Sequence, residues 1–316
     1  MSFANSWVAA WYSRKILKKE RFLTEMEMCV PRKELVEMVE SYHIANKWVW
    51  RNKINTLLML KLYFLQQRFN LSDPGMEEEV YDRTSFQKFL DIDLLNDQIP
   101  DETTICRFRH LLEANKLQEK MFVIINDILE KKNLLMKQWT IVDATIIKAS
   151  WSTKNQNKKR DPEMSSTKKW ANYTFGMKVH TGVDMKSWLV HSVEYTTASV
   201  HDSQVIDELL HGDEEAISAD KAYDKKARKQ TCRQNNVVYW IINKAVKWKK
   251  LSNNQNKHNL KWSKIRSKVE FAYWVVKHLW QHTKVRYRWL LKNWLQYVIL
   301  MWLANIYRVR KQIFCL

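Results

Sequence analysis

Thr140-Ile141-Val142-Asp143-Ala144-Thr145-Ile146-Ile147 is a segment rich in β-branched residues that a single acid interrupts. Such side chains favour strands, and residues 174–183 and 189–197 have the same character. Three strands joined by short connections predict an antiparallel meander. A carboxylate in a buried strand is strongly destabilising unless it is compensated, so Asp143 requires a metal ion, a cation or hydrogen bonds.

Helices and short strands alternate after this meander, which predicts a mixed α/β sheet. We expect them at residues 202–210 (helix), 216–219 (strand), 225–235 (helix), 237–242 (strand) and 265–279 (helix). Residues 244–262 are rich in Lys and Asn with little periodicity, and they predict an exposed basic loop.

Residues 1–135 have the apolar spacing of helices joined by short turns. In the helix that follows Pro100, Arg107 and Arg109 are expected on the exposed face, where they contact either DNA or solvent. The chain therefore divides into a helical N-terminal region and an α/β region from residue 136 onward.

The positive charge of the chain is segregated. Residues 221–316 hold 23 of the 53 Lys and Arg residues but only two of the 34 acids, a net charge of +21. The first 220 residues hold 30 basic and 32 acidic residues, a net charge of −2. This distribution is typical of a protein that binds nucleic acid. A basic surface that serves only solubility is the alternative, and an acidic membrane surface is a weaker one.

Other sequence features exclude several protein classes. The apolar residues 294–307 are too few to span a bilayer and include Gln296 and Asn305. The first residues have none of the features of a signal peptide. The four cysteines are far apart and form no Cys-x-x-Cys pair, so neither a zinc site nor a disulfide framework is predicted. We expect a cytoplasmic protein associated with the nucleoid.

Tryptophan and glycine are used in unusual proportions. The chain has 16 Trp and four Gly, whereas about 7% Gly, or roughly 22 residues, is ordinary for this length. Trp170, Trp188 and Trp248 stand in polar segments where turns favour Gly. Our hypothesis is that the gene uses UGA codons for Gly that were translated as Trp. The alternative is a protein that is truly rich in Trp.

Two further acids are candidates for chemistry. Asp220 closes the strand at 216–219, the end of a strand at which open α/β sheets bind ligands, although an Asp there is also a common helix N-cap. Glu270 is one of two acids in the basic region, and helical spacing predicts Arg266, Glu270 and Lys277 on one face. A structural ion pair between Glu270 and Arg266 is the alternative.

Several motifs resemble those of the transposases of the insertion sequence five family. They cover nearly the whole chain and are Tyr63-Phe64-Leu65-Gln66-Gln67, Leu71-Ser72-Asp73-Pro74, the segment around Asp143, Ser152-Thr153-Lys154-Asn155, Arg160-Asp161-Pro162-Glu163-Met164, Phe175-Gly176-Met177-Lys178, Val200-His201-Asp202, Ser218-Ala219-Asp220, Arg286-Tyr287-Arg288 and Leu290-Leu291-Lys292-Asn293.

This resemblance implies an α/β fold with a ribonuclease-H-like mixed-sheet catalytic core at residues 136–316 and a helical N-terminal DNA-binding region at residues 1–135. It assigns the catalytic and metal-binding acids of a DDE transposase to Asp143, Asp220 and Glu270. Arg266 and Lys277 match the basic positions that flank the glutamate, whereas Ser263 departs from the Tyr of related families. The family has Gly at the positions of Trp139, Trp170, Trp188 and Trp289, which favours the recoding hypothesis.

The resemblance also implies a mechanism. Two Mg²⁺ ions, or Mn²⁺ in their place, activate water and the freed 3′-hydroxyl, with Asp143 bridging both ions. The expected partners are DNA, as terminal inverted repeats and target DNA, and a second copy in a homodimer. DNA contacts are expected from basic residues in the last third of the chain, namely Lys249, Lys250, Arg266, Lys277, Lys284, Arg286 and Arg288. His201 is a weaker candidate for a phosphate contact. A catalytically inactive, transposase-derived DNA-binding protein and a nuclease without strand transfer are the alternatives.

Overall fold

The computed structural model describes residues 16–43, 55–154, 158–169, 171–243 and 250–314. Its helices are α2 (Lys18–Cys29), α3 (Arg32–His43), α4 (Thr56–Phe69), α5 (Asp73–Asp82), α6 (Thr84–Leu90), α7 (Glu102–Ala114), α8 (Leu117–Lys131), α9 (Lys226–Gln234), α10 (Asn253–Arg266), α11 (Glu270–Trp274) and α12 (Leu290–Phe314). Its strands are β1 (Trp139–Lys148), β2 (Ser165–Lys169), β3 (Asn172–Asp184), β4 (Val190–Thr197), β5 (Ala216–Ala219) and β6 (Val238–Ile241).

The strands form one mixed sheet. β1 pairs with β3, and β3 with β4, in antiparallel fashion, which confirms the predicted meander. β5 and β6 extend the sheet on the other side of β1, both parallel to it. The sequence did not predict β2, a short strand of polar residues that pairs with the first half of β3.

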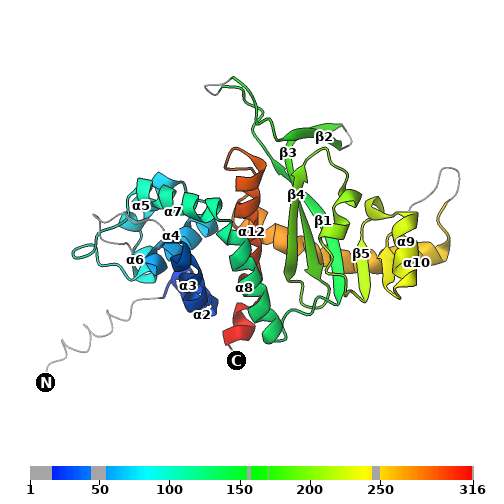
Figure 1. The fold of residues 1–316 in the computed structure, drawn as a ribbon, viewed down its shortest axis with the longest axis horizontal. Helices are drawn as coiled ribbons and strands as arrows, with labels where there is room; N and C mark the ends of the chain where they lie inside the picture. Colours follow the sequence, from blue (N-terminus) through cyan, green and yellow to red (C-terminus); the bar gives the residue numbers. More distant parts are fainter. Residues whose placement is uncertain (1–15, 44–54, 155–157, 170, 244–249, 315–316) are drawn as a thin grey trace, which may run out of the picture.

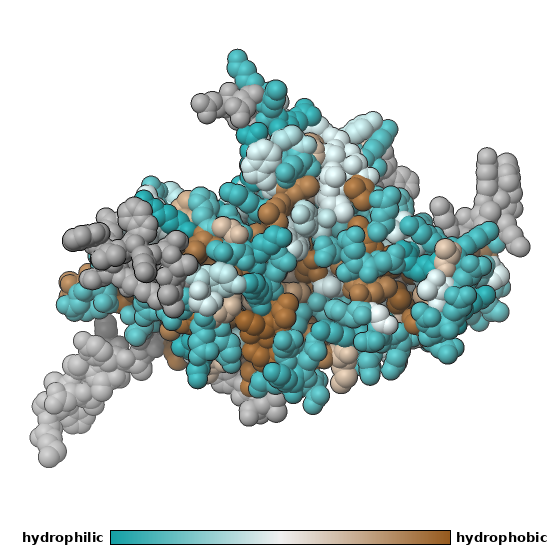
Figure 2. All heavy atoms as spheres, in the orientation of Figure 1, coloured by the Kyte–Doolittle hydropathy of each residue, from teal (hydrophilic) through white to brown (hydrophobic). Residues whose placement is uncertain are grey.

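Helices α8 and α12 lie between the N-terminal helices and the sheet (Figure 1). α12 packs against α2, α4 and α8 and also against β4, so one continuous core joins the helical region to the sheet. The residues of α12 from 294 to 306 are all buried, which explains their apolar character without a membrane. No helix in the described ranges is long and apolar enough to cross a membrane. Figure 2 shows a largely hydrophilic face, with apolar side chains gathered mainly along the middle of the molecule.

Local capping explains where α4 begins and ends and where α5 begins. The side chain of Asn55 accepts a hydrogen bond from the backbone N–H of Leu57 at the start of α4. Asn70 ends α4 in the left-handed conformation. The side chain of Ser72 then accepts from the N–H of Gly75 and starts α5, with Pro74 in its first turn.

Two secondary-structure predictions need correction. Residues 253–262 of the expected loop belong to α10, whereas residues 244–249 lie outside the described residues. α10 begins with a capping box between Ser252 and Gln255, and it buries only Trp262, so it has no apolar stripe from which periodicity could predict it. The helix expected at 202–210 consists of two short 3₁₀ turns, Asp202–Gln204 and Ile206–Glu208.

The prediction that Arg109 is exposed is wrong. Its guanidinium is buried and donates to Glu113 at 2.9 Å and to Asp73 at 2.8 Å, so it joins α7 to the start of α5. Burial and the pairing with Asp73, 36 residues away, are non-local features, and they reverse what the polar pattern of the helix indicates. Arg107, two residues earlier, is exposed as predicted.

Replacing Arg109 with Met is expected to lower the free energy of unfolding by about 3–5 kcal/mol, because Asp73 and Glu113 lose the buried cation that they share. Urea denaturation measures the change. The exposed Arg107→Met is the control and should change stability by less than about 0.5 kcal/mol. Equal losses in the two variants would contradict the buried ion network.

Two tryptophans have backbone conformations that favour glycine. The φ angle is +63° at Trp188 and +79° at Trp289. A bulky residue in this region is an outlier, whereas Gly adopts it without strain. Trp139, in contrast, lies in a regular strand, and Trp170 and Trp248 lie outside the described residues. The backbone therefore favours the recoding hypothesis at positions 188 and 289.

Replacing Trp289 with Gly is expected to raise the free energy of unfolding by about 1 kcal/mol, because left-handed strain is removed from a side chain that packs little. The matched control is Trp274→Gly, since Trp274 is similarly exposed but helical, with φ of −63°. The control should be destabilised by about 1 kcal/mol. A loss of stability at position 289, or UGG codons at positions 188 and 289 in the gene, would contradict the hypothesis.

Candidate active site

The pairing of β1 with β5 brings Asp143 and Asp220 to the same level of the sheet. These strands are parallel, and their last paired residues are Val142 and Ala219. Asp143 and Asp220 each come one residue later, Asp143 within the longer β1 and Asp220 directly after β5. Because parallel strands run in the same direction, both acids emerge at one edge of the ladder.

The carboxylate of Asp143 is largely removed from solvent. Its side chain is 17% exposed, and its Oδ1 lies 3.3 Å from Nη1 of Arg266. Burial raises the pKa of Asp143 to about 6, and the charges of Asp220 and Glu270 act in the same direction, while Arg266 opposes them. Asp220 and Glu270 are therefore both close enough to Asp143 for their charges to act on it.

The three acids are not arranged so that all of them could bind one metal ion. Within the described part of the chain, no three His, Cys, Asp or Glu side chains are placed so that they could hold one ion together. Asp220 accepts a hydrogen bond from the N–H of Lys221 at 2.7 Å and caps a 3₁₀ turn, Lys221–Tyr223, so the N-cap alternative is part of its role. The donor set itself, three carboxylates, suits a hard divalent cation.

One face of a helical segment lies along β1. The segment comprises α10, a 3₁₀ turn (Ser267–Val269), α11 and a π-helical turn (Val275–Leu279), and its later part is the orange helix that crosses the strands in Figure 1. Arg266 reaches Asp143, and the ammonium of Lys277 donates to Thr145 Oγ1 at 2.6 Å and to the carbonyl of Ile146 at 2.8 Å. Glu270 lies between them in the sequence and is exposed, and its charge acts on Asp143.

The ion pair of Arg266 differs from the sequence-based alternative. Among the described residues, the carboxylate paired with Arg266 is that of Asp143, not that of Glu270. Burial lowers the pKa of Lys277 to about 8, and the charge of Lys148 adds to this effect. Two of the three donors of the Lys277 ammonium are used by β1.

The other predicted DNA-binding residues lie in different surroundings. Lys250, Lys284 and Arg288 are exposed, whereas Lys249 lies outside the described residues. Arg286 is half-buried and donates to the carbonyl of Asn70 at 3.2 Å, so it also joins the helical region to the rest of the chain. His201 is exposed, and its Nδ1 accepts from the backbone N–H of Ser203.

Sequence reasoning missed Tyr273 and Thr181. The hydroxyl of Tyr273 donates to the carbonyl of Asp143 at 3.0 Å and lies 2.7 Å from Thr181 Oγ1. Tyr273 follows Glu270 by three residues, so helical spacing could have placed it on the same face. No sequence signal identified Thr181.

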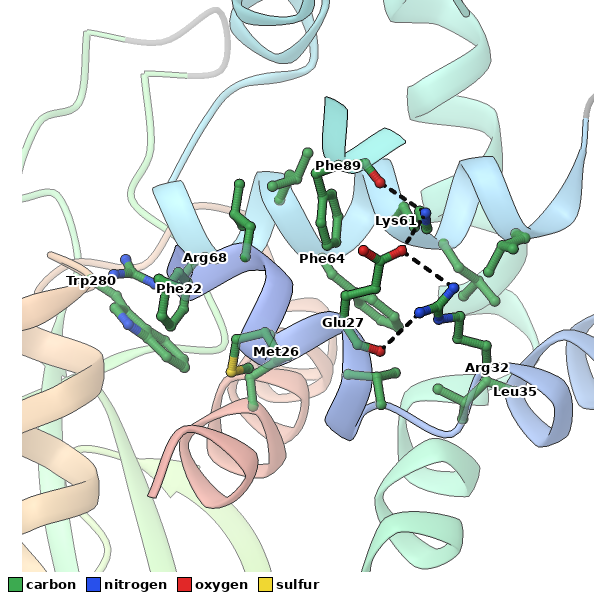
Figure 3. A pocket seen from close by; sticks show the side chains of 16 residues that line it. Phe22, Met26, Glu27, Arg32, Leu35, Lys61, Phe64, Arg68, Phe89 and Trp280 are labelled. Carbon is green, nitrogen blue, oxygen red and sulfur yellow. Dashed lines mark hydrogen bonds and ion pairs between the residues drawn. The ribbon is translucent and has the colours of Figure 1, made fainter. Parts of the chain in front are cut away.

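An apolar pocket elsewhere in the molecule is part of the N-terminal packing. It lies between α2, α3 and α4, and its polar groups pair with one another: Lys61 contacts Glu27 at 2.7 Å, and Arg32 contacts the same carboxylate at 3.3 Å (Figure 3). The guanidinium of Arg68 packs on the rings of Phe22 and Trp280. None of the three predicted acids lines this pocket.

Two family models match the chain. Residues 135–306 match the transposase DDE domain, and residues 12–111 match a transposase domain (DUF772). The chain belongs to the DDE transposase family. The match confirms the resemblance to the transposases of the insertion sequence five family and identifies the sheet of this transposase as ribonuclease-H-like. The family acts on DNA and uses divalent metal ions. No solved structure matches this transposase.

Replacing Arg266 with Gln is expected to raise the pKa of Asp143 above about 6, because the cation that favours its ionised form is removed while its burial remains. Carboxyl ¹³C NMR of chelator-treated protein measures this pKa. The matched control is Arg228→Gln, since Arg228 pairs with the exposed Asp207. A pKa of Asp143 that does not change in the Arg266 variant would contradict the ion pair.

Proposed function

We propose that this transposase binds the ends of an insertion sequence and catalyses metal-dependent DNA cleavage and strand transfer, with Asp143, Asp220 and Glu270 as its catalytic acids. The observation that carries the proposal is the placement of the acids. Two follow the last paired residues of neighbouring parallel strands, and the third lies on α11, whose Tyr273 contacts the first of these strands.

The three carboxylates would together hold the two divalent cations, Mg²⁺ or Mn²⁺, of the proposed mechanism. When bound, the cations lower the pKa of water and neutralise charge on the leaving oxygen of a phosphodiester. Asp143 suits this role because its carboxylate is largely buried, where an uncompensated charge is unfavourable and a cation is strongly preferred. Asp220 retains one oxygen beyond the one that accepts from Lys221.

The basic side chains near the acids would position DNA. A guanidinium has five donors in a fixed fork, so Arg266 can hold Asp143 and a phosphate oxygen together. Lys277 has one donor left after its two contacts with β1. The exposed Lys250, Lys284 and Arg288 would contact the DNA backbone, and Arg286 and Lys249 complete the proposed set. Two copies of the chain would act together, since transposition joins two DNA ends.

A catalytically inactive DNA-binding protein is the second candidate. It is favoured by the ion pair between Asp143 and Arg266 and by the open arrangement of the acids in the described residues. Both candidates share the basic C-terminal third. The two candidates differ in whether the acids catalyse DNA cleavage, so a cleavage measurement distinguishes them.

Replacing Asp143 with Asn is expected to reduce Mg²⁺-dependent nicking of labelled element-end DNA by at least about 100-fold, since several kcal/mol of transition-state stabilisation depends on the metal ligand. Asp207→Asn is the control, because that carboxylate is 70% exposed and pairs only with Arg228 among the ion pairs of the described residues. DNA binding by the parent protein without any cleavage would favour the inactive DNA-binding protein instead.

A further inference from the structure

The hydroxyl of Tyr273 connects three elements at the level of Asp143. Tyr273 lies in α11, Asp143 in β1 and Thr181 in β3, and Asp143 and Thr181 face each other across the β1–β3 ladder. The hydroxyl is 3.0 Å from the carbonyl oxygen of Asp143 and 2.7 Å from Oγ1 of Thr181. One side chain of the helix therefore contacts both strands where the first acid lies.

The direction of these hydrogen bonds follows from their chemistry. A carbonyl oxygen only accepts, so the single proton of the phenol goes to Asp143. The hydroxyl of Thr181 must then donate to the phenol oxygen. Tyr273 is 7% exposed and Thr181 is fully buried, so water does not readily replace either partner.

Tyr273 also lies one helical turn from Glu270. Glu270 is exposed and begins the same short helix, so any movement of α11 away from β1 would carry Glu270 with it. Arg266 and Lys277 hold the segment on either side of this point, at Asp143 Oδ1 and at Thr145 and Ile146. Of these contacts, that of Tyr273 is the one made with the backbone of Asp143 itself.

We propose that Tyr273 is a positioning residue that sets the separation of Asp143 and Glu270, and through it the affinity of the site for its divalent cation. This inference rests on the proposed function, because it assumes that both acids bind the metal. Tyr273 itself uses its only proton within the protein, so it acts through the acids rather than on DNA. Groups that orient metal ligands typically change metal affinity about 10–100-fold when they are removed.

The test uses Tyr273→Phe in the full chain, which removes one oxygen and keeps the ring. Titration calorimetry with Mn²⁺ alone should show about 10–100-fold weaker binding, and the Mn²⁺ concentration for half-maximal nicking should rise in parallel. Thermal unfolding without metal monitors the fold. The matched control is Tyr297→Phe. Tyr297 lies in α12, apart from the acids, and its buried hydroxyl donates to the carbonyl of His282 at 2.8 Å.

The outcomes separate this inference from the function on which it rests. Both variants should lose similar thermal stability, while only Tyr273→Phe weakens Mn²⁺ binding. Unchanged Mn²⁺ binding in Tyr273→Phe, or equal weakening in both variants, would overturn the positioning role of Tyr273. If Asp143→Asn abolished Mn²⁺ binding in the same experiment, the proposed metal site itself would stand. If Asp143→Asn bound Mn²⁺ as tightly as the parent, the metal site would be wrong and this inference would fail with it.

Discussion

The parallel pairing of β1 with β5 is the constraint on which the candidate site depends. The ladder is only four residues long, from Trp139 with Ala216 to Val142 with Ala219. Its register decides that Asp143 and Asp220 come to the same level, because a shift of one residue would turn every side chain of a strand to the opposite face. Val142, Ile217 and Ala219 are buried in one apolar cluster, so burial of these side chains holds the register that the acids require.

The site also requires the helical segment to lie against β1, and polar contacts hold it there. Arg266 and Lys277 are both partly buried, a position in which a charge is destabilising unless it is paired or hydrogen-bonded. Their partners are on β1, and Tyr273 adds a contact with its backbone. The contacts that compensate these polar groups therefore also hold the segment that carries Glu270. The stability of this region and the geometry of the candidate site depend on the same contacts.

The tryptophans show a conflict between side chain and backbone. At Trp188 and Trp289 the backbone is in the left-handed region, which suits Gly and strains a residue with an indole. At Trp280 and Trp302, in contrast, the ring is almost fully buried, and the ring of Trp302 packs edge-on against Phe64 at 5.2 Å. The tryptophans thus differ in backbone conformation, and the strained positions favour the recoding hypothesis, although the ring of Trp188 also packs under the guanidinium of Arg308.

The sequence by itself determined the strands of the meander, the mixed α/β class, the DDE transposase resemblance and the three candidate acids, because local periodicity and short motifs carry this information. It did not determine that α10 is helical, since that helix buries only Trp262, or that Arg109 is buried. Only the tertiary structure decided that Arg266 pairs with Asp143, that Lys277 holds Thr145 and that Tyr273 reaches the Asp143 carbonyl. The partners in these contacts are separated by 123, 132 and 130 residues, and folding alone brings such distant atoms together.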